Sequence, residues 1–206
     1  KNFPWLQARE FNINEIPIRA LRINYIGELG WELHHPMNKM EKLYDILYSA
    51  GKKYEITNFG TYAVNSLRIE KAYKGWGSEL TGEISLVESG MDRFYNLSKK
   101  DDFIGSNSVK EKLKNGVAIK IVHLEIDADS SDAIGNEPIY HNGKIVGVVT
   151  SGGFGHRINK SLAFGYVDSD KSEKNIELEV EILGKRRKAL ILDKIPYDEQ
   201  NLRLKS

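Results

Sequence analysis

The sequence predicts an α+β region followed by a small antiparallel β-barrel, and three observations support this fold class. Strand-like alternation and helix-like periodicity both occur before residue 100. After residue 115, short alternating segments separated by turn residues follow one another closely. Asn142-Gly143, between two of these segments, is the strongest hairpin signal in the chain. We therefore expect two domains, residues 1–100 and residues 101–206.

The first region is expected to contain two strands and two helices. Residues 18–26 alternate and are rich in β-branched and aromatic side chains, as strands are. Gly27 and Gly30 then permit a tight turn before WELHH, which we expect to form a second strand. The helices are expected after Asn38 as far as Gly51, and over residues 61–72 with Gly75 and Gly77 ending the segment.

The second region is expected to hold one short helix and the strands of the barrel. Ser106 or Asn107 can open the helix. A second turn is expected at Leu183-Gly184-Lys185, and we interpret the basic run at 185–188 as a solvated hairpin end. The strands are expected within residues 117–127, 137–151, 161–168 and 175–193.

Composition and charge exclude several classes of protein. Thirty basic against 29 acidic residues give a net charge of +1, far from the basic field that drives nucleic-acid binding. The sequence has no cysteine, which excludes disulfides and thiolate nucleophiles and fits a reducing compartment. It has no run of about 18 apolar residues, so we expect no membrane span. The histidines lack the spacing of a metal site, so we expect no metal.

Glu28 and Glu32 flank the glycine turn and are the first candidate site residues. A carboxylate there can accept hydrogen bonds from paired N–H donors, such as a pteridine edge, or act as a general base. Two surface glutamates at a strand end are the alternative interpretation. Tyr25 and Trp76 also lie beside glycines, where an aromatic side chain can stack on a flat heterocycle or belong to the core.

Arg68 falls on the largely apolar face of the second expected helix, where an arginine needs a partner. The partner can be a ligand carboxylate held in a bidentate fork. It can equally be Glu28, Glu32 or Glu70 in a structural ion pair. Residue types alone leave both alternatives open.

Several collinear motifs carry a resemblance to a known family. They are YIGELGWEL at 25–33, NFGTYAVNSLRIEKAYKGWGSEL at 58–80, KKDDFIG at 99–105, GNEPIYHNGKIVGVVTSGGFG at 135–155 and SLAFGYV at 161–167. In this order they resemble the aminomethyltransferase family, the T-protein of the glycine cleavage system. Within this family, the sequences of the motifs most resemble the folate-binding C-terminal region of dimethylglycine and sarcosine dehydrogenases. The resemblance implies the C-terminal part of a T-protein-like folate-binding domain, followed by the barrel.

The resemblance also implies roles for individual residues. The family binds tetrahydrofolate and moves a one-carbon unit onto it from an amine donor. Tyr25 matches the tyrosine of Y-x-G-E, and Glu32 matches the second glutamate of G-E-x-G-x-E, which grips the pterin ring. Arg68 matches the arginine of L-R-x-E, which the family uses for folate binding. Trp76 stands where many T-proteins have tyrosine, so a stacking surface is kept and a hydroxyl is lost.

The family's essential aspartate lies upstream of the matched region, so no catalytic residue is assigned within this chain. The sequence opens KNFPWLQAREF without an initiator Met, and we expect it to be a fragment or the C-terminal region of a longer chain. FAD is expected only where an upstream flavin domain, in the same or a partner chain, oxidises the amine. A regulatory folate-binding module and a demethylase of another methyl donor are alternative functions. The expected compartment is the cytoplasm, or the mitochondrial matrix in a eukaryote.

Overall fold

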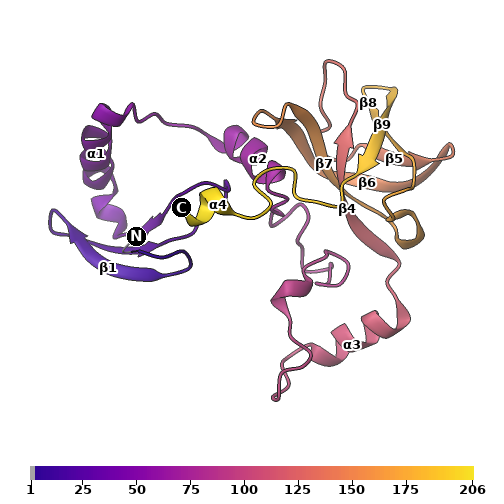
Figure 1. The fold of residues 1–206 in the computed structure, drawn as a ribbon, viewed down its shortest axis with the longest axis horizontal. Coiled ribbons are helices and arrows are strands. Elements are labelled where there is room, and N and C mark those ends of the chain that lie inside the picture. The colour runs from indigo at the N-terminus through magenta and orange to yellow at the C-terminus, as the bar shows by residue number, and fades with distance from the viewer. Residues whose placement is uncertain (1–2) are drawn as a thin grey trace. The chain divides into compact units, whose positions relative to one another are not determined.

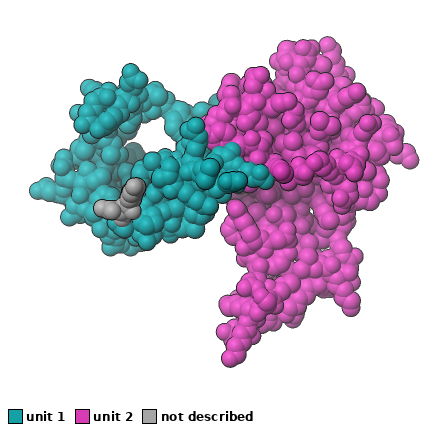
Figure 2. All heavy atoms as spheres, viewed as in Figure 1, with its two compact units in different colours: residues 1–64, 198–206 teal, residues 65–197 magenta. Residues whose placement is uncertain are grey.

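The computed structural model describes residues 3–206, which form two compact units (Figure 2). Unit 1 comprises the chain up to Val64 together with Asp198–Ser206, and unit 2 comprises Asn65–Tyr197. The chain passes between the units after Val64 and after Tyr197, whereas the sequence placed a domain boundary near residue 101. Residues 1–100 and 101–206 therefore remain predicted domains.

Unit 1 is built on a three-stranded antiparallel sheet, β1 (Ala8–Ile13), β2 (Ile16–Leu21) and β3 (Glu32–His34), in that order (Figure 1). Alternate residues of β2 are buried and pack with Leu43 of helix α1 (Met40–Gly51). The core of unit 1 therefore follows from period-2 burial on a strand and one apolar helix face. A 3₁₀ turn precedes α1 and another follows it, at Met37–Lys39 and Lys52–Tyr54.

In unit 1, one predicted strand is shorter than expected, and one strand was not predicted. The strand expected over residues 18–26 ends at Leu21, because Asn24 turns the chain: its Oδ1 accepts from the N–H groups of Ile26 and Gly27, at 3.0 and 2.7 Å. Strand β1 was not expected at all. Five of its six residues are exposed, so its sequence lacks the buried alternation by which strands are recognised.

The last residues of the chain also belong to unit 1. Helix α4 (Leu202–Lys205) buries Leu204. The guanidinium of Arg22 donates to the carbonyl oxygens of Phe3 and Ser206, at 2.5 Å each. Unit 1 is therefore assembled from both ends of the chain.

Unit 2 contains the closed barrel that the sequence predicts, with neighbouring strands paired in the order β4-β7-β6-β5-β8-β9 (Figure 1). All of these pairs are antiparallel. The strands are β4 (Ile119–Ile126), β5 (Pro138–His141), β6 (Lys144–Gly155), β7 (Lys160–Asp168), β8 (Leu178–Ile182) and β9 (Lys185–Ile191). The helices are α2 (Thr61–Glu70), which begins in unit 1, and α3 (Ser106–Asn115), with 3₁₀ turns at Asp92–Phe94 and Ser169–Lys171.

Both predicted hairpins are confirmed. Asn142 and Gly143 have φ values of 50° and 78°, and Leu183 and Gly184 have 49° and 75°, as two-residue hairpin turns with positive φ require. The basic run that we interpreted as a hairpin end forms the first residues of β9, and three of its four residues are exposed. Helix α2 stops at Glu70, earlier than expected, because Ala72 turns left-handed at φ 55° and the Tyr73 N–H bonds to the Arg68 carbonyl.

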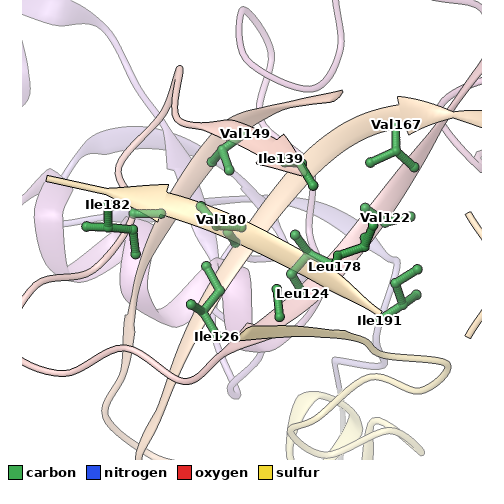
Figure 3. Close-up of a cluster of buried hydrophobic side chains, with 13 residues drawn as sticks. Val122, Leu124, Ile126, Ile139, Val149, Val167, Leu178, Val180, Ile182 and Ile191 are labelled. Atoms are coloured by element: carbon green, nitrogen blue, oxygen red, sulfur yellow. The ribbon is translucent and has the colours of Figure 1, made fainter. Parts of the chain in front are cut away.

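The barrel has one core inside and a second one outside. Side chains from all six strands fill the interior, as Figure 3 shows for Val122, Leu124, Ile139 and their neighbours. On the outer face, Leu162 and Phe164 of β7 pack with Ile69 of α2. Strand β7 is therefore buried on both faces, which explains its nearly continuous apolar sequence.

Close backbone contact between β6 and β7 requires glycine at position 147. A Cβ there would lie 2.2 Å from the carbonyl oxygen of Tyr166. We predict that Gly147→Ala lowers the free energy of unfolding by about 1–3 kcal/mol, as overpacking does. Urea denaturation measures this, and Gly82→Ala is the control, since its Cβ would meet nothing within 4 Å. Equal effects of the two substitutions would contradict this account of the barrel wall.

Candidate functional site

The centre of the candidate site in unit 2 is a buried ion pair between Arg68 and Glu79, 2.9 Å apart. Helix α2 carries Arg68, whose side chain is 5% exposed, and the Glu79 side chain is fully buried. The guanidinium uses all five of its N–H groups. The acceptors are Asn65 Oδ1 (twice), the Tyr73 carbonyl, Glu79 Oε2 and Ser151 Oγ, at 2.7–2.9 Å.

The Glu79 carboxylate is equally well satisfied. Its Oε1 accepts from the hydroxyls of Thr150 and Ser151, at 2.7 and 2.6 Å. These two residues are consecutive on β6, and both reach one oxygen because the register of β6 shifts between Val149 and Ser151. Its Oε2 accepts from Arg68, from the Gly75 N–H at 2.7 Å and from the Ser78 hydroxyl at 3.1 Å.

These donors determine the charge of Glu79. Burial alone raises the pKa of a carboxyl, but hydrogen bonds from Ser151 and Gly75 and the positive charge of Arg68 outweigh it. The pKa of Glu79 therefore lies below its ordinary value of 4.5, and the group is an anion at neutral pH.

The partner of Arg68 differs from those that the sequence suggested. Glu70 is buried and pairs instead with Arg157, whose backbone N–H donates to it at 2.7 Å and whose Nε contacts its second oxygen. The Arg157 guanidinium also lies 3.7 Å from the centre of the Tyr197 ring. Glu28 and Glu32 are not partners of Arg68 either, because its donors are all used. Arg68 therefore does form a structural ion pair, but its acidic partner is Glu79. The predicted partners Glu28, Glu32 and Glu70 were wrong.

Trp76 lies at the tip of a tight turn between α2 and Glu79, and 81% of its surface is exposed. The turn is closed by hydrogen bonds from the Gly77 N–H to the Leu80 carbonyl and from the Leu80 N–H to the Gly75 carbonyl, at 2.8 and 3.0 Å. Trp76 is thus an exposed aromatic on an ordered turn, and it does not belong to the core.

Tyr25 and Glu28 lie in the turn region between β2 and β3 in unit 1, and Glu32 is the first residue of β3. Tyr25 is 39% exposed, and the Glu32 carboxylate lies 3.6 Å from His34 Nε2. Asn24 organises this turn, since its amide also contacts the Glu28 carbonyl. The structure therefore places these three predicted residues in unit 1, and Arg68 and Trp76 in unit 2.

Sequence reasoning missed Asn24, Glu79 and the two hydroxyl residues of β6. An asparagine shortly before a glycine is a turn signal that could have identified Asn24. Nothing local marks Glu79 as buried, because its partners come from α2 and from a strand more than 70 residues away.

His123 is not a candidate acid or base. It stacks on Phe164 with ring centroids 4.5 Å apart. Burial and the nearby cations of Lys74 and Arg68 lower the pKa of His123 to about 3. The imidazole is therefore neutral at physiological pH, and we assign it a packing role.

Among residues 3–206, no group of three or more His, Cys, Asp or Glu side chains is placed to hold a metal ion. The described helices include none with the length and apolar character needed to cross a bilayer.

Comparison with known proteins identifies the family. The model of the GCVT N-terminal domain matches residues 1–99, and that of the glycine cleavage T-protein C-terminal barrel domain matches residues 120–198. Together they cover most of the chain in the order expected from its motifs. The chain therefore belongs to the glycine cleavage T-protein family.

Individual relatives agree with this assignment. Mitochondrial dimethylglycine dehydrogenase of Mus musculus is 45% identical over 190 residues, which are 92% of this chain and 22% of that protein. The mitochondrial pyruvate dehydrogenase phosphatase regulatory subunit of Mus musculus is 31% identical over 205 residues, covering 91% of this chain and 23% of that protein. The crystal structure of glycine cleavage system aminomethyltransferase T from Bartonella henselae superposes with a TM-score of 0.83 at 25% identity, covering 97% of this chain and 54% of that one.

The chain thus spans about a fifth of these mouse proteins and about half of the bacterial aminomethyltransferase. Its fold is that of the T-protein family, as the resemblance of its motifs implied.

Loss of one member of the buried pair should be severe. We predict that Arg68→Ala lowers the free energy of unfolding by about 3–5 kcal/mol, because it leaves a buried carboxylate without its cation. Urea unfolding followed by circular dichroism checks this, with the exposed Arg93→Ala as control. A loss no greater than that of the control would show that the pair does not stabilise the fold.

The lowered pKa of Glu79 predicts a pH dependence. Its contribution to stability should be complete above the ordinary value of 4.5 and should be lost as the pH falls through the lower folded pKa. Urea unfolding between about pH 6 and pH 3 measures how far the free energy of unfolding falls with pH. This fall should be smaller in Glu79→Gln. The exposed Glu83→Gln should leave it unchanged. If Glu79→Gln follows the wild-type curve, Glu79 is not the titrating group.

Proposed function

We propose that this chain is the folate-binding part of an enzyme that transfers a one-carbon unit from an amine donor to tetrahydrofolate. The observation that carries this proposal is the match of two T-protein family models to the chain, in order. The upstream part of such an enzyme would supply the catalytic group, since none is assigned in this chain. Transfer is then mainly a matter of positioning the pterin nitrogen close to the incoming carbon.

The candidate residues suit a flat ligand with hydrogen-bond donors on its edge. In unit 1, the carboxylates of Glu32 and Glu28 offer acceptors for pterin N–H groups, and Tyr25 offers an aromatic face. In unit 2, Trp76 offers an exposed aromatic face of its own. Arg68 is buried inside unit 2, and its five N–H groups are bound to protein acceptors.

For the donor, we propose an amine derived from dimethylglycine. The 45% identity to mouse dimethylglycine dehydrogenase, against 34% to an aminomethyltransferase of Synechocystis sp., supports this choice. Oxidation of that amine would require FAD, held by a flavin domain outside this chain. Both mouse relatives carry "mitochondrial" in their names, which favours the mitochondrial alternative over the cytoplasmic one.

A second candidate function is a folate-binding or regulatory module without transfer activity. The likeness to a phosphatase regulatory subunit supports it specifically. A turnover assay separates the two functions: the first requires that the intact protein converts tetrahydrofolate and dimethylglycine to methylenetetrahydrofolate, and the second requires binding without conversion.

Calorimetric titration of this chain with tetrahydrofolate tests the proposal, and we expect micromolar binding. Glu32→Gln keeps the shape and removes the charge, so we predict an affinity about tenfold lower, as for loss of a charge-assisted hydrogen bond. The exposed Glu41→Gln on α1 is the matched control and should bind as wild type does. An unchanged affinity of Glu32→Gln would remove Glu32 from the site, and no binding by the folded chain would refute a self-sufficient folate site.

A further inference from the structure

We propose that Arg68 and Glu79 are positioning residues that fix the turn of residues 73–80, so that Trp76 forms a rigid stacking platform for the folate ring. In this account Arg68 does not touch folate. The inference rests on the proposed function for the identity of the ligand, but the fixing of the turn does not depend on it.

Arg68 has no donor to offer a ligand. Its five N–H groups are directed to protein acceptors, and the side chain is 5% exposed. A ligand oxygen could bind only by displacing Asn65, Ser151, the Tyr73 carbonyl or Glu79. The displaced acceptor would be left buried without its hydrogen bond, which costs more than a new bond would return.

The ion pair holds the turn at both of its ends. Arg68 donates to the Tyr73 carbonyl at the start of the turn, at 2.9 Å. Glu79 accepts from the Gly75 N–H and the Ser78 hydroxyl within it, at 2.7 and 3.1 Å. Trp76 therefore lies between two points that are bound to one buried ion pair.

The same carboxylate fastens the turn to the barrel. Glu79 Oε1 is bound by the two hydroxyls of the β6 bulge, Thr150 and Ser151. The backbone carbonyl of Glu79 also accepts from the Tyr166 hydroxyl of β7, at 2.8 Å. The turn is thereby attached to two adjacent strands of a closed sheet.

A fixed turn gives an exposed aromatic a specific use. A tryptophan that is 81% exposed gains little from burial in the folded chain itself. When its backbone is already ordered, stacking of a heterocycle on the indole costs little further entropy, so more of the stacking energy appears as affinity. The buried charges thus act on the ligand through Trp76.

A double-mutant cycle tests this coupling in the 206-residue chain, with tetrahydrofolate binding measured by calorimetry. We expect Trp76→Ala and Glu79→Gln each to weaken binding by about tenfold, the scale of one lost stacking contact. The double variant should bind no worse than Trp76→Ala, because Glu79 acts through Trp76. If the two effects multiply instead, Glu79 acts independently of the platform and the proposal is overturned.

Two further variants keep the test informative. Arg68→Lys retains the charge but loses the five-donor fork, so it should weaken binding as Glu79→Gln does; near wild-type affinity would mean that only the charge matters and would overturn the proposal. If Glu79→Gln does not fold, Thr150→Val removes one donor to the carboxylate without a change of shape. It should weaken binding in the wild-type background and leave Trp76→Ala unaffected, and an additive effect would count against the coupling.

Hydrogen exchange without ligand separates this inference from the proposed function. Glu79→Gln should speed exchange at the amides of Gly75, Gly77 and Leu80 and leave the β7 amides protected, while Glu83→Gln should change neither. Unchanged exchange in the turn would overturn the positioning role even where folate binds. Faster exchange in a chain that does not bind tetrahydrofolate would uphold the fixing of the turn and refute the folate assignment.

Discussion

A carboxylate without solvent exposure, Glu79, sets the main constraint on unit 2. Removing an ion from water costs several kcal/mol, so the fold must surround both members of the Arg68–Glu79 pair with hydrogen bonds. It does so from three elements: the helix that carries Arg68, the turn that leads to Glu79 and the bulged strand that supplies two hydroxyls. Each element supplies hydrogen bonds to the same ion pair. If one of them moved, a buried charge would lose part of its hydrogen bonding or become exposed to solvent. This is how a polar cluster can determine where an exposed side chain such as Trp76 lies.

The barrel provides the fixed frame for this cluster. Strand β7 is buried on both faces, with its inner residues in the barrel core and Phe164 on the outside against α2. The bulge in β6 changes the direction of two neighbouring side chains, and the hydroxyls of Thr150 and Ser151 converge on one oxygen. An irregularity in one strand of an otherwise regular sheet thus links the structural core to the candidate site.

Local sequence rules predicted most of the features that have local causes. The Asn142-Gly143 hairpin and the helices α1, α2 and α3 follow from turn chemistry and periodicity, and the structure confirms them, although α2 ends two residues earlier than predicted. The early end of β2 also has a local cause but was not predicted, because the side chain of Asn24 competes with the strand for backbone N–H groups and this turn signal was missed. The partner of Arg68 could not be predicted in this way. Its nearest acidic neighbour in sequence, Glu70, points to Arg157, and Glu79 is reached only once the turn has formed. Strand β1 was not predicted because a largely exposed strand does not show the alternation of buried and exposed residues.

The discontinuity of unit 1 has a consequence for biosynthesis. Its last segment, Asp198–Ser206, supplies buried Leu204 and the carbonyl that binds Arg22. During translation these residues leave the ribosome after every residue of unit 2. Unit 2 can therefore complete its barrel while unit 1 still lacks part of its structure. A nascent chain stalled before residue 198 would carry a finished barrel and an unfinished N-terminal unit, the species on which a chaperone would act.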